Sequence, residues 1–104
     1  MSVYAIAQLR IHDPVKYGRY VDRFMEVFKN YKGRVLAADE SPLTIEGAWD
    51  GDKVVLISFP DEASFRNWVE SPDYLEIAKD RKAGAKSVIV LVKGITSHSE
   101  VAKI

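Results

Sequence analysis

Two runs of consecutive apolar residues constrain the fold of this chain most strongly. Val54–Ile57 and Val88–Val92 each place aliphatic side chains at successive positions. Successive residues of a β-strand point to opposite faces of its sheet, so neither run has one apolar and one polar face. Both faces of the sheet that contains these strands must therefore be covered.

A strand over 3–9 and a helix that begins after Asp13 precede these runs. Asp13 supplies the N-cap oxygen, and Pro14 suits the first helical turn, which needs no backbone donor. Large apolar side chains then recur every three or four residues, as one face of a helix requires. They are Tyr17, Tyr20, Val21, Phe24, Phe28 and Tyr31. We expect Gly33 to end this helix.

The rest of the chain completes the order β-α-β-β-α-β. Further strands are expected over 34–38, 53–59 and 87–92. The segment 43–49 continues extended up to a turn at Asp50-Gly51-Asp52. Ser71-Pro72 breaks the second helix, which ends at Gly84. This order predicts an α+β, ferredoxin-like protomer with a four-stranded antiparallel sheet.

Helices on one side of such a sheet leave its other face exposed. That face would carry more apolar side chains than soluble monomers usually present as one patch. We expect a second copy to cover it, sheet against sheet about a two-fold axis, which makes the protein a homodimer. The alternative is that strand twist and the segment 39–49 cover the face.

Composition excludes several classes of protein. Fifteen Lys and Arg balance fifteen Asp and Glu, so the basic excess of a nucleic-acid or anionic-membrane binder is missing. No cysteine is present, which excludes disulfides and zinc–thiolate sites. The first residues have neither the basic start nor the apolar length of a signal peptide. We expect one cytoplasmic domain over 1–95 and a polar tail over 96–104, either a loose end or an arm that reaches a partner.

The chain offers no metal or cofactor motif. His12 and His98 are its only histidines, and neither has a second ligand at a coordinating spacing. A Gly-rich phosphate loop and a nucleophile motif are also missing from the sequence. We therefore expect neither a metal nor a cofactor, and His12 is interpreted as a solvated residue at the helix entry.

A set of aromatic and charged side chains suggests a ligand pocket between sheet and helices. Tyr74 and Arg81 are two helical turns apart, so they project from one side of the second helix pair. We expect Glu46 and Trp49 to meet them there. The candidate ligand-binding residues are Tyr20, Glu46, Trp49, Trp68, Tyr74 and Arg81. The alternatives are a plain aromatic core and a structural Glu46–Arg81 ion pair.

Several of these residues form a pattern that resembles the domain-of-unknown-function 1330 family, of the dimeric α/β-barrel superfamily, over about residues 3–94. The pattern comprises Tyr20, Tyr31-x-Gly33-Arg34, Glu46-Gly47-x-Trp49, Phe59-Pro60, Trp68, Ser71-Pro72-x-Tyr74 and Arg81. The resemblance implies a ferredoxin-like protomer and a dimer closed into a barrel. Ala37-Ala38 stands where family members often carry a basic residue.

The resemblance implies no activity, and three functions remain in view. The first is binding of a small molecule in the aromatic pocket. The second is a small enzyme resembling cofactor-independent oxygenases, in which Tyr74, Arg81 and Glu46 handle protons and orient the substrate. The third is a purely structural dimer. Fold alone does not choose among them.

Overall fold

The computed structural model describes residues 1–95, and the tail expected over 96–104 lies outside them. The chain follows the order β-α-β-β-α-α-β, with the second helix split in two as predicted. The elements are β1 (Val3–Ile11), α1 (Pro14–Phe28), β2 (Arg34–Asp39), β3 (Lys53–Phe59), α2 (Glu62–Val69), α3 (Pro72–Gly84) and β4 (Ala85–Lys93).

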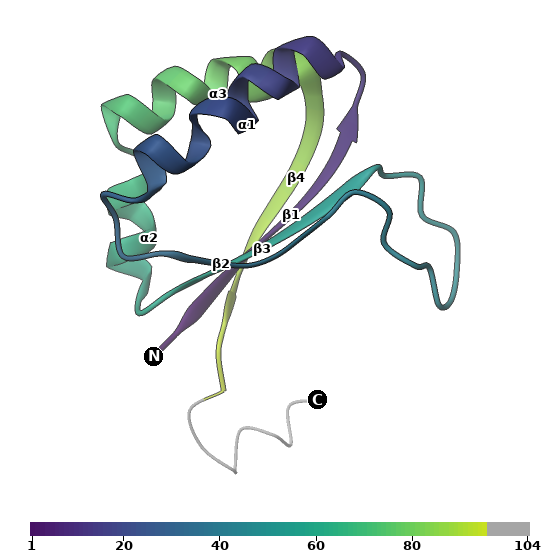
Figure 1. The fold of residues 1–104 in the computed structure, drawn as a ribbon. Helices are drawn as coiled ribbons and strands as arrows, with labels where there is room; N and C mark the ends of the chain where they lie inside the picture. Colours follow the sequence, from purple (N-terminus) through teal and green to yellow (C-terminus); the bar gives the residue numbers. More distant parts are fainter. Residues whose placement is uncertain (96–104) are drawn as a thin grey trace.

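The strands form one antiparallel sheet in the order β2-β3-β1-β4. All three helices lie on one side of it, with α1 and α3 next to each other (Figure 1). The α+β, ferredoxin-like prediction is therefore confirmed. A bulge at Leu36 shifts the pairing of β2 with β3, so that Val35 and Ala38 share the helix-facing side.

Side-chain caps start the helices where the sequence places them. The Asp13 carboxylate accepts a hydrogen bond from the Lys16 backbone N–H at 3.2 Å, and Pro14 follows it. The Ser71 hydroxyl caps α3 in the same way, accepting from Tyr74 N–H at 3.2 Å. The expected end of α1 is wrong: the helix stops at Phe28, before Gly33. Gly33 instead lets the chain pass close to the aromatic core, where a Cβ would collide with the Phe28 and Phe59 rings.

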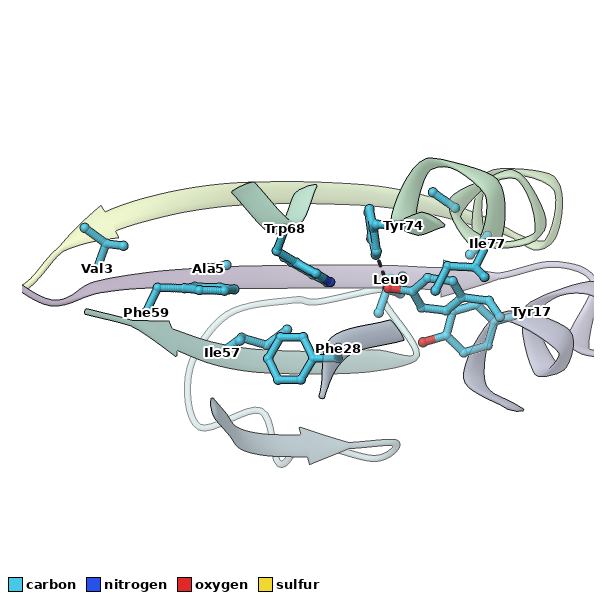
Figure 2. Close-up of a cluster of buried hydrophobic side chains, with 13 residues drawn as sticks. Val3, Ala5, Leu9, Tyr17, Phe28, Ile57, Phe59, Trp68, Tyr74 and Ile77 are labelled. Atoms are coloured by element: carbon cyan, nitrogen blue, oxygen red, sulfur yellow. Dashed lines mark hydrogen bonds between the residues drawn. The ribbon is translucent and has the colours of Figure 1, made fainter. Parts of the chain in front are cut away.

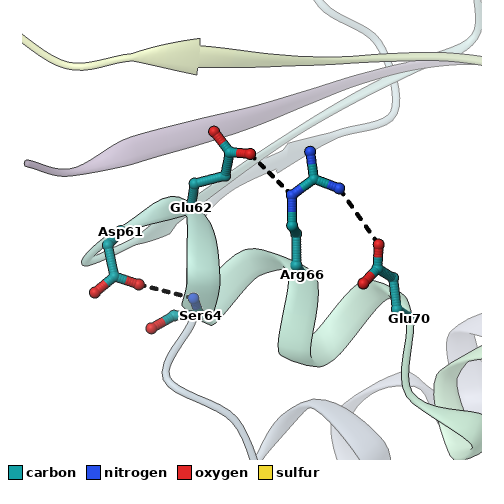
Figure 3. Close-up of polar contacts among 5 residues, drawn as sticks. All are labelled: Asp61, Glu62, Ser64, Arg66 and Glu70. Atoms are coloured by element: carbon teal, nitrogen blue, oxygen red, sulfur yellow. Dashed lines mark hydrogen bonds and ion pairs between the residues drawn. The ribbon is translucent and has the colours of Figure 1, made fainter.

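Polar contacts cap the start of α2 and link its successive turns (Figure 3). The Asp61 carboxylate accepts from Ser64 N–H at 2.7 Å, and this hydrogen bond lowers the pKa of Asp61. Arg66 donates to Glu62 at 2.8 Å and to Glu70 at 3.3 Å, each one helical turn away. Such exposed pairs contribute little stability individually.

The core lies between the helices and one face of the sheet (Figure 2). Phe59 and Trp68 stack at 5.5 Å between ring centroids, and Phe28 meets both rings edge-on. Edge-to-face and offset aromatic pairs add to the free energy of burial. Ile77 of α3 is fully buried toward the other end of the core, near Tyr17 (Figure 2).

The opposite side of the sheet, which we call the open face, is also apolar. Strand register places seven apolar side chains there: Tyr4, Ile6, Val54, Leu56, Val88, Val90 and Val92. The three valines of β4 remain 57%, 49% and 43% exposed. The prediction of strands that are apolar on both faces is therefore confirmed.

The segment between β2 and β3 does not cover the open face. Residues 40–52, which we call the arm, form a loop that projects away from the helices (Figure 1). Leu43 and Ile45 on it are 83% and 85% exposed. The expectation of an extended strand over 43–49 is wrong, because β2 stops pairing with β3 at Asp39. The alternative in which this segment buries the sheet fails with it.

Candidate functional site

A cavity of about 260 Å³ lies between the helices and the helix-facing side of the sheet. Its floor comes from β1 and β3, and its walls come from all three helices. Val21 and Met25 of α1 and Val35 and Ala38 of β2 line it and are exposed. These side chains mark a mouth between α1 and the edge strand β2.

Small residues on the strands create this space. Ala5 and Ala7 lie at the middle of β1, on the side that faces the helices. Ala38 of β2 also lines the cavity and lies opposite Val55 of β3. Methyl side chains here leave unfilled volume under α1 that larger strand residues would occupy. The positions of these alanines in the sheet therefore create the cavity.

Two tyrosine hydroxyls meet at the cavity wall. Tyr20 of α1 and Tyr74 of α3 share a hydrogen bond of 3.0 Å between their hydroxyl oxygens (Figure 2). Burial raises the pKa of Tyr20, and the adjacent Tyr74 hydroxyl raises it further. The Tyr20 hydroxyl therefore stays neutral at physiological pH. The Trp68 ring packs on Tyr74 at 4.3 Å between centroids.

Nitrogen donors also reach the cavity lining. The Lys53 ammonium lies 5.0 Å from the centre of the Tyr17 ring, and Arg81 lies 5.9 Å from that of Tyr20. Both contacts are cation–π interactions. Arg81 Nε and Trp68 Nε1 are buried without a hydrogen-bond partner among residues 1–95.

The structure brings together four of the six candidate ligand-binding residues. Tyr20, Trp68, Tyr74 and Arg81 all line the cavity, whereas Glu46 and Trp49 do not. The predicted convergence of Glu46 and Trp49 with Tyr74 and Arg81 is wrong for this protomer. Glu46 and Trp49 lie on the arm and line a separate shallow depression. The sequence predicts that their segment, 43–49, continues extended as part of the sheet, whereas in the structure it is a loop.

Lys53 is a cavity residue that was not predicted from the sequence. A charged residue at the start of a strand normally faces water. Lys53 instead pairs with Leu9 and points to the helix-facing side, where it is buried. In the sequence, Lys53 belongs to the same every-second-residue series as Val55, Ile57 and Phe59, which indicates that it points to the same face of its strand.

Within residues 1–95, no three His, Asp or Glu side chains gather to hold a metal ion. No helix in that range has the length and apolar character needed to cross a membrane.

Comparison with known sequences identifies the family. The pattern that defines DUF1330, a domain of unknown function, matches residues 2–95. The chain belongs to the DUF1330 family. No curated protein matches the sequence.

Solved structures of low sequence identity share the fold. RPA0582, a protein of unknown function from Rhodopseudomonas palustris, is 20% identical with a TM-score of 0.78; the match covers 92% of this chain and 84% of that one. SnoaB, a cofactor-independent oxygenase from Streptomyces nogalater, is 17% identical with a TM-score of 0.66, covering 93% and 96%. A dimeric ferredoxin-like protein of unknown function from Thermobifida fusca is 16% identical with a TM-score of 0.65, covering 90% and 92%. At these identities the likeness concerns the fold, and the site must be interpreted from its own residues.

Proposed function

We propose that this DUF1330 protein binds a small organic molecule in the cavity between its helices and its sheet. The observation that carries the proposal is a cavity with apolar walls that also contains unpaired buried donors. Binding sites for small molecules combine these two features, since apolar walls supply affinity and a few polar groups orient the ligand. The volume of about 260 Å³ suits a ligand smaller than a typical drug.

A purely structural role leaves the polar groups unexplained. Leaving a buried donor without a partner costs about 1–3 kcal/mol. Trp68 Nε1 and Arg81 Nε both carry such a cost in the protomer. A ligand that accepts hydrogen bonds from them would offset it, whereas a plain core has no use for them.

Binding is favoured over an oxygenase-like reaction by the titratable groups present. No Asp, Glu or His among residues 1–95 lines the cavity, so a general base at neutral pH is missing there. The raised pKa of Tyr20 keeps its hydroxyl protonated, so this group does not serve as a base. Glu46, which the enzymatic hypothesis needs, lies on the arm.

We propose in addition that the protein is a homodimer in which the open face is the interface. Strands about 4.8 Å apart with about 3.3 Å per residue give this sheet roughly 500 Å² in projection. That is of the order of the roughly 800 Å² that each partner buries in a standard interface. A second copy supplies a matching apolar surface by symmetry, and the exposed Leu43 and Ile45 of the arm extend it.

Titration with 2-naphthol, followed by NMR of the two indole N–H groups, tests the binding proposal. We expect saturable shifts of the Trp68 signal, because Trp68 lines the cavity, and little change at Trp49 on the arm. Saturation without any shift at Trp68 would contradict the proposal.

Two neighbouring alanines give a matched pair of variants. Ala38 lines the cavity, whereas Ala37 pairs with Leu56 on the open face. Ala38→Phe should weaken 2-naphthol binding about tenfold or more by filling the mouth, which corresponds to about 1.4 kcal/mol. Ala37→Phe should leave binding within about twofold of wild type. Equal effects of the two variants would place the ligand elsewhere.

A further inference from the structure

Two cationic side chains reach the cavity without a carboxylate beside them. Lys53 enters from the start of β3 and is buried, and Arg81 enters from α3. Neither forms an ion pair within 4.0 Å with any residue of 1–95. Each cation lies instead near an aromatic ring, Lys53 near that of Tyr17 and Arg81 near that of Tyr20.

The other lysines and arginines among residues 1–95 are exposed to water, and four of them have carboxylate partners. Arg66 contacts Glu62 and Glu70 (Figure 3), and Arg10 contacts Asp50 at 3.1 Å. Lys79 contacts Glu76 at 2.8 Å. The chain has as many acidic as basic residues, so the missing partners do not reflect a shortage of carboxylates. Lys53 and Arg81 lack ion-pair partners because no carboxylate among residues 1–95 lines the cavity.

The side-chain nitrogens of Trp68, Arg81 and Lys53 at the cavity are all hydrogen-bond donors. Arginine, lysine and the tryptophan indole donate and cannot accept. In the Tyr20–Tyr74 pair one hydroxyl donates to the other, so the accepting tyrosine retains a proton of its own to offer. A ligand matching this wall presents acceptor atoms and carries negative charge.

We infer that the cavity takes an organic anion, with an apolar aromatic body and one carboxylate or ionised hydroxyl. This inference rests on the proposed binding function and names its ligand class. The anionic group lies among Lys53, Arg81 and the Tyr20–Tyr74 hydroxyls, where charge-assisted hydrogen bonds are strongest. The apolar body lies against Trp68 and the alanines of β1. Burying the Lys53 ammonium and half-burying Arg81 is costly without a partner, and a bound anion would offset that cost.

Calorimetric titration at pH 7 with three ligands of one shape tests this inference. The probes are 2-naphthoate, neutral 2-naphthamide and cationic 2-naphthylmethylammonium. We expect 2-naphthoate to bind at least about tenfold more tightly than 2-naphthamide, as hydrogen bonds to a charged group imply. The ammonium compound should bind most weakly of the three.

Charge-removing variants locate the source of the selectivity. Arg81→Met and Lys53→Met should each reduce the naphthoate-to-naphthamide ratio about threefold or more and leave 2-naphthamide affinity nearly unchanged. Lys82→Met is the matched control, because Lys82 is the exposed neighbour of Arg81 on α3 and does not line the cavity. Thermal melting of each variant shows whether it remains folded, and Arg81→Met serves alone if Lys53→Met does not fold.

The outcomes separate this inference from the binding proposal. If 2-naphthamide and 2-naphthoate bind equally and both shift the Trp68 indole, the cavity binds ligands but has no preference for anions, and the inference is wrong. If neither compound nor 2-naphthol shifts Trp68, both proposals fail. If Lys82→Met lowers the ratio as much as Arg81→Met, the selectivity comes from general surface charge and the inference also fails.

Discussion

At the scale of single residues, the Tyr20–Tyr74 hydrogen bond joins the two longest helices across the cavity wall. Both tyrosines are buried, and each hydroxyl is the partner of the other at 3.0 Å. Removing one hydroxyl leaves the other without a hydrogen-bond partner in an apolar site. Removing both removes the need for a partner.

This asymmetry predicts non-additive variants. Tyr74→Phe should lower the free energy of unfolding by about 1–3 kcal/mol, because the Tyr20 hydroxyl loses its partner. Tyr20→Phe should cost a similar amount. The double variant should cost clearly less than the sum of the two, with a coupling of at least about 0.5 kcal/mol. Urea unfolding of the four proteins measures this coupling, and additive values would show that the bond is not formed in solution.

Residue types at the site were partly predictable from the sequence. Tyr20, Trp68, Tyr74 and Arg81 occupy helical positions whose spacing indicates the inward face, and the structure has all four at the cavity. Lys53 escaped prediction because lysine is rarely buried. Its orientation follows from strand register, which is set by pairing with β1.

At the scale of elements, the start of α1 and the end of α3 are joined through the backbone. The Gly84 carbonyl accepts hydrogen bonds from the N–H groups of His12 and Asp13, each at 3.0 Å. A Cβ at Gly84 would lie 2.5 Å from the Tyr17 nitrogen and 2.9 Å from the Asp13 oxygen. Gly84 was predicted as a helix stop, and α3 does end there. The close approach to α1 is a second reason for glycine at this position.

Gly84→Ala should therefore destabilise the protein by about 1–3 kcal/mol, since neighbouring backbone must shift. Gly18 supplies the control, because it lies within α1 and nothing is within 4 Å of its ideal Cβ position. Gly18→Ala should stabilise by about 0.5–1 kcal/mol through helix propensity. Thermal or urea unfolding distinguishes the two, and the same sign for both would contradict the packing at Gly84.

At the scale of the whole molecule, the proposed homodimer depends on the open face. Register assigns Val88, Val90 and Val92 to this face, whereas Leu91 packs toward the core. The two kinds of position on one strand should respond differently to a charge. This difference makes the proposed homodimer testable without unfolding the protomer.

Val90→Lys should convert a dimer into a folded monomer. Light scattering at micromolar concentration should give twice the 11.7 kDa chain mass for wild type and the single chain mass for the variant. Leu91→Lys should lower the melting temperature instead, because Leu91 faces the core. Val15→Lys, at an exposed position of α1, should change neither property. A wild-type mass near 11.7 kDa would refute the dimer.

Most helices and strands, and the need to cover two apolar sheet faces, could be predicted from the sequence. Helical spacing, capping residues and strand composition act locally or by simple periodicity, so they can be seen in the order of residues. The position of Glu46 and Trp49 on the arm, and of Lys53 and Arg81 at one cavity, became visible only in the folded chain. Those outcomes depend on where β2 stops pairing, on the register of β3 against β1, and on alanines that leave space beneath α1. Each depends on a relation between distant segments, which a local pattern such as the alternation of Lys53 with Val55 signals only in part.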